Sequence, residues 1–499
     1  MKLNKLSLLC AAACLGFAGQ AAAQVSSNAA ALAVVDSANA NGRILYVSGA
    51  SAVQGGLAQI AATLFTGTNY AFIPSAASGR TNSDYRAFAG NLAVAAGGWT
   101  AGTPVIIVNR ARGGSVQGVN PVARGESIES LQITAASCTA GAGTSAAPFQ
   151  CNTLENRVPD AGVSDVAPRL FDGQFNTEGE PSEPALNPAE LATLSAQPIY
   201  GLAFGVPMSN TLPLFNINKA AVSAIMTGNV GTWAEVDASL PGDDILLCRR
   251  VNGSGTQAVS NLYFGNYPCG ASNVPADRAS GSAWNGSNAF IVEGDTGFLD
   301  VVENSSSGNV RTCLSTAAAA AAAPFNAAAN PATGVGYTSY TTADRAGNPV
   351  TVRIRNGRPH KAIGVLSMDS LNNSTTSPTG WSFRSLDGAG QITWNGNVAT
   401  PPVTTGTGRF PTLASYIDAT WDQQGWISFN IPAATTGNKL ALANQFAAAA
   451  KQPAILNSLS GLRFVAAAIP GTPDPTGTGQ VLRAAYAGGD QCAPLNRNF

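Results

Sequence analysis

The stretch ILLCRRVNGSGTQAVSNLYF, residues 245–264, contains an apolar strand, a polar turn and a helix in close succession. Its apolar run, Ile245–Cys248, has the composition of a buried strand, and two arginines end it. The turn Gly253–Thr256, with the sequence Gly-Ser-Gly-Thr, combines conformational freedom with hydroxyl groups. We expect a helix to follow this turn.

Three other segments have the same order of elements: Gly42–Phe65, Thr103–Ala123 and Asn156–Phe171. In the first of them, apolar residues recur at helical spacing after a Ser-Gly-Ala-Ser turn. Repeated strand–turn–helix units predict an α/β fold in which helices cover mostly parallel sheets. In such sheets ligands bind beyond the carboxyl ends of the strands, where the turns gather. The four polar turns are therefore expected to converge.

The Gly253–Thr256 turn has the chemistry of an anion site. Backbone N–H groups at the start of a helix have no helical partner, and the helix dipole adds partial positive charge there. Ser254 and Thr256 add hydroxyl donors, and Arg250 can add a planar fork suited to an oxyanion. The alternative is a capped turn with Arg250 in a surface ion pair.

Asp165 follows a short strand in the segment GVSDVAP, Gly162–Pro168. A carboxylate repels a nearby anion unless that anion carries a proton that it can donate. Hydrogenphosphate carries such a proton and sulfate does not, so Asp165 is a candidate for selecting between them. The alternative role for Asp165 is that of a turn cap.

The composition excludes several function classes. Charged residues make up 11% of the 499 residues and the net charge is −1, so no field favours nucleic acid. The one histidine, His360, is expected on a surface loop, and it cannot build a histidine-rich metal site. We therefore expect no metal, no cofactor and no nucleic-acid partner.

The first residues resemble an export signal. Lys2 and Lys5 precede the apolar run Leu6–Phe17, and Ala21–Ala23 provides a cleavage site, which predicts a signal peptide over residues 1–23. A lipoprotein signal at Cys14 is the alternative. No later run reaches the ~18 apolar residues of a membrane span. The protein is therefore expected to be exported to the periplasm or the extracellular space.

Disulfides are expected in such a compartment, because the cysteines that remain after signal removal are even in number. These cysteines are Cys138, Cys151, Cys248, Cys269, Cys313 and Cys492. Pairing by proximity in the sequence predicts Cys138–Cys151 and Cys248–Cys269, which leaves Cys313 with Cys492. No pair has the spacing of a zinc site.

In order along the chain, several segments resemble the periplasmic phosphate-binding proteins of ABC importers, which have the type 2 periplasmic binding-protein fold. Ser48–Ala61 is similar to the first ligand loop of that family, and GVSDVAP to its Ser-Asp-x-Pro segment. Asn216–Val236 matches the pattern I-x-x-G-x-[IV]-x-x-W, and Arg249–Phe264 matches R-x-D-G-S-G-T-x-x-x-F with Asn252 in place of the aspartate. Lys361–Ser367 resembles the strand that returns to the first lobe.

The resemblance implies two α/β lobes with mixed sheets flanked by helices and a ligand in the cleft between them. The first lobe would comprise residues 24–204 and 366–499, and the second lobe residues 205–365. Ile199–Ser209 and residues 362–368 would cross between the lobes. The ligand-binding positions it implies are Ser51, Ala52, Asp165, Arg250, Ser254, Gly255 and Thr256. A more loosely matched second loop adds Arg112, Gly114 and Ser115.

The resemblance also implies a function without catalysis. An exported, monomeric binding protein would capture phosphate or a related oxyanion and present it to the membrane subunits of an ABC importer. The alternative is an extracellular surface or matrix protein that keeps the fold without transport, which suits the low charge and the Ala/Gly/Thr-rich insertions. A phosphate-handling hydrolase is disfavoured, because the sequence offers no metal cluster and no activated nucleophile.

Overall fold

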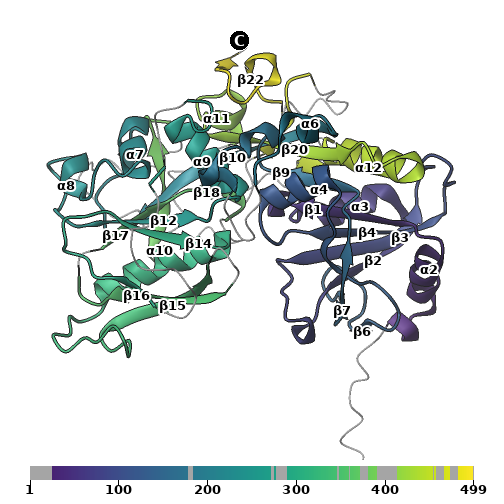
Figure 1. Ribbon diagram of the computed structural model, residues 1–499, viewed down its shortest axis with the longest axis horizontal. Coiled ribbons are helices and arrows are strands. Elements are labelled where there is room, and N and C mark those ends of the chain that lie inside the picture. Colours follow the sequence, from purple (N-terminus) through teal and green to yellow (C-terminus); the bar gives the residue numbers. More distant parts are fainter. Residues whose placement is uncertain are drawn as a thin grey trace, which may run out of the picture.

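The structure, a computed structural model, describes residues 25–177, 184–270, 275–276, 289–344, 348–358, 360–370, 380–389, 413–452, 455–456, 466–471 and 481–497. The predicted signal peptide, residues 1–23, lies outside these residues. Among the helices that are described, none has the length and apolarity needed to cross a membrane. Two α/β lobes stand side by side, as Figure 1 shows.

One sixteen-stranded sheet continues through both lobes, and strand β10, Leu194–Ser209, connects its two parts. The first part of β10 pairs antiparallel with β20, Gln424–Pro432. Its last residues pair with β17, β18 and β19 instead. The segment predicted to cross between lobes, Ile199–Ser209, lies within this strand.

The first lobe, on the right in Figure 1, is built on strands β9, β1 and β4, which are parallel, and β3 and β2, which are antiparallel. Helix α2 packs on one face of this sheet, and α3 and α12 pack on the other. The bounds are β1 Ile44–Gly49, β2 Phe65–Pro74, β3 Tyr85–Leu92, β4 Pro104–Arg110, β6 Cys138–Ala140, β7 Phe149–Cys151, β9 Ala161–Ser164, α2 Ala29–Ala40, α3 Leu57–Leu64, α4 Asn120–Arg124 and α12 Gly437–Ala450. A hairpin, β5 Ile128–Leu131 and β8 Leu154–Arg157, and short helices, α5 Gln174–Thr177 and α6 Pro188–Leu191, complete it.

The second lobe contains the parallel strands β14, β12 and β17, against which helix α10 packs. A separate three-stranded sheet, β13–β16–β15, lies beside it. The bounds are β11 Asn216–Ile217, β12 Ile245–Arg250, β13 Phe290–Val292, β14 Asp300–Asn304, β15 Tyr337–Ala343, β16 Pro349–Arg355, β17 Lys361–Gly364, β18 Leu366–Ser367, β19 Trp381–Leu386, α7 Lys219–Met226, α8 Trp233–Val236, α9 Gly255–Gly265 and α10 Ser307–Ala322. Strand β19 falls in the range predicted for the first lobe, yet it pairs with β11 and with the end of β10.

Helix α11, Leu413–Ile417, and strand β22, Ala484–Tyr486, lie at the top of the molecule in Figure 1. Strand β21, Ala466–Ala467, pairs with β10 in the large sheet. The C-terminal segment, residues 481–497, contains β22 and its partner β23, Leu495–Arg497. The Tyr486 ring packs edge-on against Trp426 of β20, and the Gln491 side chain accepts a hydrogen bond from the Ala167 amide at 2.7 Å. These contacts attach the segment to the first lobe.

The six cysteines form three disulfides, of which the sequence predicted one correctly. Cys138 and Cys151 face each other on β6 and β7 and are bonded. The other two predicted pairs are wrong: Cys248 bonds to Cys313 on α10, and Cys269 bonds to Cys492. Cys248 and Cys269 lie on opposite sides of the eleven-residue helix α9, about 16 Å long. That length exceeds the Cα–Cα distance that a disulfide can span.

His360 is buried rather than on the surface. Only 1% of the residue is exposed, and burial lowers the pKa of its imidazole to about 4. It stands just before β17, a central strand, and the turn at Gly294 covers it so closely that a Cβ there would meet the ring at 2.1 Å. The polar residues around His360 suggested a surface loop, but the residue leads directly into a buried central strand.

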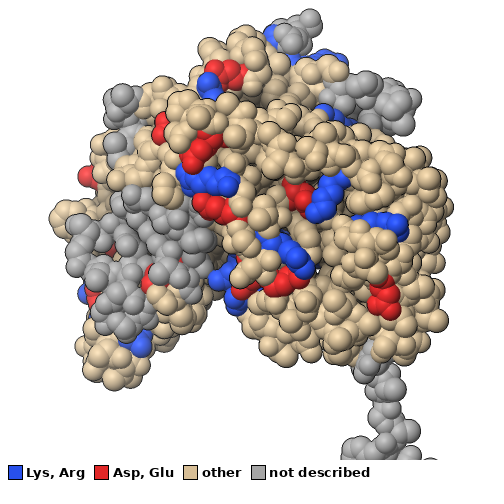
Figure 2. Space-filling view, turned by 45° about the vertical axis from the view of Figure 1, so that its right-hand side comes forward, with Lys and Arg blue, Asp and Glu red and all other residues tan. Residues whose placement is uncertain are grey.

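Charged side chains are sparse on the surface. On the face in Figure 2 most atoms belong to uncharged residues, and the acidic and basic side chains alternate in small groups. Among the described residues on this face, no extended region carries charge of one sign.

Candidate functional site

A cavity of about 320 Å³ lies between the lobes, and residues of both lobes line it. All ten positions singled out in the sequence belong to this lining: Ser51, Ala52, Arg112, Gly114, Ser115, Asp165, Arg250, Ser254, Gly255 and Thr256. The structure therefore brings together residues that are up to about two hundred positions apart in the chain. Their binding of an anion stays a prediction.

The first lobe contributes three turns that follow adjacent parallel strands. β1 is followed by the 3₁₀ turn Ser51–Val53, β4 by the 3₁₀ turn Ser115–Gly118, and β9 by Asp165. Because these strands are parallel neighbours, their carboxyl ends meet at one edge of the sheet. The strands are also very close there, since a Cβ on Gly49 would lie 2.0 Å from the Val163 carbonyl oxygen.

The second lobe contributes two strand–helix junctions. β12 leads to α9 with Ser254 at the N-cap, and β14 leads to α10 with Ser306 at the N-cap. The Ser306 hydroxyl accepts a hydrogen bond from the Asn309 amide at 3.0 Å, so it caps the helix in the usual way. The two N-termini belong to helices of eleven and sixteen residues, and both border the cavity with their partial positive charge.

Arg250 is the charged group between these two helix ends. Its guanidinium donates to the carbonyl oxygens of Asn304 and Ser305 at 3.2 and 3.0 Å and to the Ser307 hydroxyl at 3.0 Å. These three bonds fix the plane of the guanidinium. The residue is 9% exposed, which means that the charge lies in a largely desolvated position.

Asp165 approaches the second lobe from the opposite wall. The residue is 8% exposed, and its backbone amide donates to the Ser115 hydroxyl at 3.2 Å. Gly255 lies directly against this pair, because a Cβ at Gly255 would be 2.2 Å from Ser115 Oγ and 2.5 Å from Asp165 Oδ2. A glycine at the first position of α9 therefore lets the lobes come together around the cavity.

The lobes also bond to each other beside the cavity. The Val116 amide donates to the Gly253 carbonyl oxygen at 3.0 Å, and the Asn252 side chain donates to the Gln174 carbonyl oxygen at 3.2 Å. Asn261 of α9 donates to the side chain of Asn176 at 2.8 Å. The structure thus shows the lobes in a closed arrangement.

Asn252, which stands in place of the aspartate of the motif R-x-D-G-S-G-T, contacts Arg249. Its side-chain oxygen accepts a hydrogen bond from Arg249 Nη2 at 2.5 Å. Arg250 is oriented by Asn304, Ser305 and Ser307, so the arginine that faces the cavity has its own set of partners.

The sequence analysis missed a further group of lining residues: Ser83, Asp84, Ser305, Ser306, Ser307, Gly308, Arg311, Ser367 and Ser370. Five of these belong to the junction between β14 and α10. The sequence DVVENSSSGNVRTC, residues 300–313, has an apolar strand, a Ser-Ser-Ser-Gly turn and a helix, which is the same pattern as in the other four units. That repeated pattern is the signal that could have found them.

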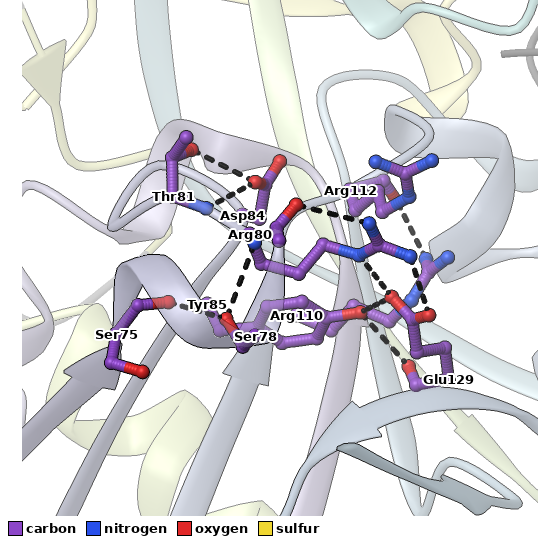
Figure 3. A network of polar contacts seen from close by, with 10 residues as sticks. Ser75, Ser78, Arg80, Thr81, Asp84, Tyr85, Arg110, Arg112 and Glu129 are labelled. Carbon is purple, nitrogen blue, oxygen red and sulfur yellow. Dashed lines mark hydrogen bonds and ion pairs between the residues drawn. The ribbon is translucent and has the colours of Figure 1, made fainter. Parts of the chain in front are cut away.

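A charged network stands behind the first-lobe wall and is drawn in Figure 3. Arg80 and Glu129 form a two-bonded ion pair at 2.7 and 2.8 Å, and the Tyr85 hydroxyl donates to Glu129 at 2.7 Å. The hydrogen bond from Arg80 lowers the pKa of Glu129 to about 2, and the charge of Arg112 contributes in the same direction. Arg110 donates to the Arg112 carbonyl oxygen at 2.5 Å, which fixes the backbone of that wall.

No family model matches the chain, and no curated protein matches it. Among solved structures it is similar to one from Clostridium perfringens described as a phosphate ABC transporter substrate-binding protein with bound phosphate (10% identity, TM-score 0.40, covering 84% of this chain and 98% of that one). It is also similar to PstS from Borrelia burgdorferi (11% identity, TM-score 0.35, covering 85% and 98%). A third is a high-affinity periplasmic phosphate-binding protein, PfluDING, bound with phosphate (13% identity, TM-score 0.37, covering 84% and 90%).

Proposed function

We propose that this chain is an exported protein that binds phosphate between its two lobes and presents it to the membrane subunits of an ABC importer. One observation carries the proposal. Arg250 and the N-termini of α9 and α10 meet Asp165 across a single cavity between the lobes. The surface carries little charge, so an anion depends on this local set of donors for its binding.

The lining accounts for both attraction and selection. Arg250 and the two helix ends favour negative charge in a place that is largely removed from water. Asp165 opposes negative charge unless the ligand donates a proton to its carboxylate. Hydrogenphosphate satisfies both walls, because its unprotonated oxygens accept from Arg250 while its hydroxyl donates to Asp165. Sulfate satisfies the first wall only.

Ligand binding would favour the closed lobes. An anion held by Asp165 from one lobe and by Arg250 from the other gains both sets of contacts only when the lobes are together. Its differential affinity therefore shifts the population toward the closed form. An importer could recognise that form by its shape, which would link transport to occupancy.

Binding rather than catalysis suits the lining. Its polar side chains are the hydroxyls of serines and Thr256, three arginines and the carboxylates of Asp84 and Asp165, and the chain's one histidine, His360, is not among the lining residues. We therefore assign no catalytic role to the site.

A calorimetric titration of the mature protein with phosphate, arsenate and sulfate tests the proposal. We expect binding of phosphate and arsenate and markedly weaker binding of sulfate. X-ray scattering with and without phosphate, after dialysis to remove bound anions, should show a smaller radius of gyration when phosphate is present. Absence of any anion binding would contradict the proposal.

One observation favours the second candidate, a surface or matrix protein without transport. The disulfide between Cys269 and Cys492 joins the segment after α9 to the C-terminal segment that packs on the first lobe. A covalent link of this kind restricts the opening that an importer needs for ligand release. If scattering shows no change of radius with phosphate in the oxidised protein, this second function is the better description.

A further inference from the structure

We infer that the cavity has a second anion-binding part at its rim, and that the ligand it fits is pyrophosphate rather than a single phosphate. This inference rests on the proposed function. Its first basis is size. A phosphate ion takes the place of about two water molecules, or roughly 60 Å³, since one water occupies about 30 Å³. The cavity, at about 320 Å³, has room for a considerably larger ligand.

The second basis is the position of Arg311. It is the fourth residue after Ser307 in α10, and residues at this spacing lie on the same face of a helix. Both therefore line the cavity, with Ser307 next to Arg250 and Arg311 one turn further along the helix. Arg311 Nη1 donates to the Ser370 carbonyl oxygen at 3.1 Å, which orients the side chain.

Arg112 extends the first-lobe wall in a similar way. It lines the cavity next to Gly113 and Gly114, and its backbone is fixed by the hydrogen bond from Arg110 to its carbonyl oxygen. Figure 3 shows Arg112 above the network of Arg80 and Glu129. The rim of the cavity thus has two half-buried arginines, Arg112 on the first lobe and Arg311 on the second, whereas Arg250 in the second-lobe wall is buried.

The lining carries net positive charge, which favours an anionic ligand. Its charged residues are Arg112, Arg250 and Arg311 against Asp84 and Asp165, which leaves one net positive charge before the helix ends are added. Asp84 is engaged locally, because its Oδ2 accepts from the Thr81 amide and hydroxyl at 2.7 and 2.8 Å. Two phosphoryl groups, one at Arg250 and one between Arg112 and Arg311, match this distribution.

Asp165 separates pyrophosphate from a phosphate ester. A phosphate monoester has its second pKa near 6, so above neutral pH it has no proton left to donate to a carboxylate. Pyrophosphate keeps one proton near pH 7.5 while carrying more negative charge than hydrogenphosphate. It can therefore donate to Asp165 and still provide acceptors for all three arginines.

The test is calorimetry in metal-free buffer near pH 7.5 with phosphate, pyrophosphate and glycerol 3-phosphate as separate titrants. The proteins are the parent, Arg311→Gln, Arg112→Gln and, as a control, Arg157→Gln, which removes an exposed arginine of the β5–β8 hairpin. We expect the parent to bind pyrophosphate at least about tenfold more tightly than phosphate. Each rim variant should lose about tenfold in pyrophosphate affinity and change phosphate affinity by less than about twofold. The control should match the parent.

The possible results separate the two proposals. If the parent binds phosphate as tightly as pyrophosphate, or if the rim variants weaken both anions equally, the rim site is wrong while phosphate binding stands. Tighter binding of glycerol 3-phosphate than of pyrophosphate also overturns the inference. If the parent binds none of the three, the proposed function fails with it. Arg311→Lys keeps the charge without the planar fork, so it should retain part of the pyrophosphate affinity. Partial retention would show that the loss in Arg311→Gln is due to the missing charge and not to misfolding.

Discussion

In the function proposed above, the two walls of the cavity would recognise an anion by different means. The second-lobe wall has Arg250 and the N-termini of two long helices, all of which attract any oxyanion. The first-lobe wall has Asp165 between short 3₁₀ turns, and its carboxylate accepts only a ligand that brings a proton. The comparison indicates that affinity depends mainly on the second lobe and selectivity on the first. Substitutions in the two walls should therefore have separable effects.

The largest effect is expected from Arg250→Ala in the second-lobe wall. It removes a charge that three neutral acceptors hold in place at 9% exposure. We expect phosphate and sulfate affinity to fall together by at least tenfold, about 1.4 kcal/mol. Arg250→Lys should recover part of the loss, because it restores charge without the fork. Calorimetry with both anions checks this, and affinities equal to the parent's would remove Arg250 from the site.

A substitution at the contact between the two walls tests whether phosphate binding requires the lobes to close. Gly255→Ala adds a Cβ that would lie 2.2 Å from Ser115 Oγ and 2.5 Å from Asp165 Oδ2, closer than van der Waals contact allows. We expect the lobes to stay partly apart and phosphate affinity to fall about tenfold, about 1.4 kcal/mol. Gly242→Ala is the matched control, because a Cβ there meets nothing within 4 Å. Calorimetry and X-ray scattering on both variants decide the matter, and an unchanged Gly255→Ala would mean that the walls adjust freely.

The sequence was most informative where chemistry and backbone geometry coincide. Gly255 and Asp165 could be placed in the cavity lining because both follow the carboxyl end of a strand, where the turns of an α/β sheet gather. Ser307 and Arg311 were overlooked because their turn matches none of the motifs of the phosphate-binding proteins given above. The alanine-rich helix that follows the turn also reads as low-complexity sequence. The pairing of Cys269 with Cys492 depends on how distant segments pack, which no local pattern contains.

Asp165→Asn in the first-lobe wall should alter selectivity more than affinity. The amide removes the negative charge and can donate to an unprotonated anion, so sulfate gains a partner where it now meets a carboxylate. A buried mismatch of this kind costs about 1–3 kcal/mol. We expect the ratio of sulfate to phosphate dissociation constants near pH 7.5 to shrink, mainly through tighter sulfate binding. An unchanged ratio would show that Asp165 only caps its turn and would favour the function without transport.

The smallest effect concerns the network behind the first-lobe wall, where Glu129→Gln removes the partner of Arg80. The pKa of Glu129 is lowered to about 2 in the folded protein, so its carboxylate stabilises the fold above its unfolded pKa, which lies near 4.3. That contribution is lost as the pH falls from there toward 2. Because the ion pair is partly exposed, we expect the variant to be less stable by on the order of 1 kcal/mol near pH 7. The difference from the parent should shrink steadily below pH 4 in urea unfolding. A difference that is constant with pH would mean that Glu129 acts through packing alone, and the first-lobe wall would then owe none of its stability to this charge pair.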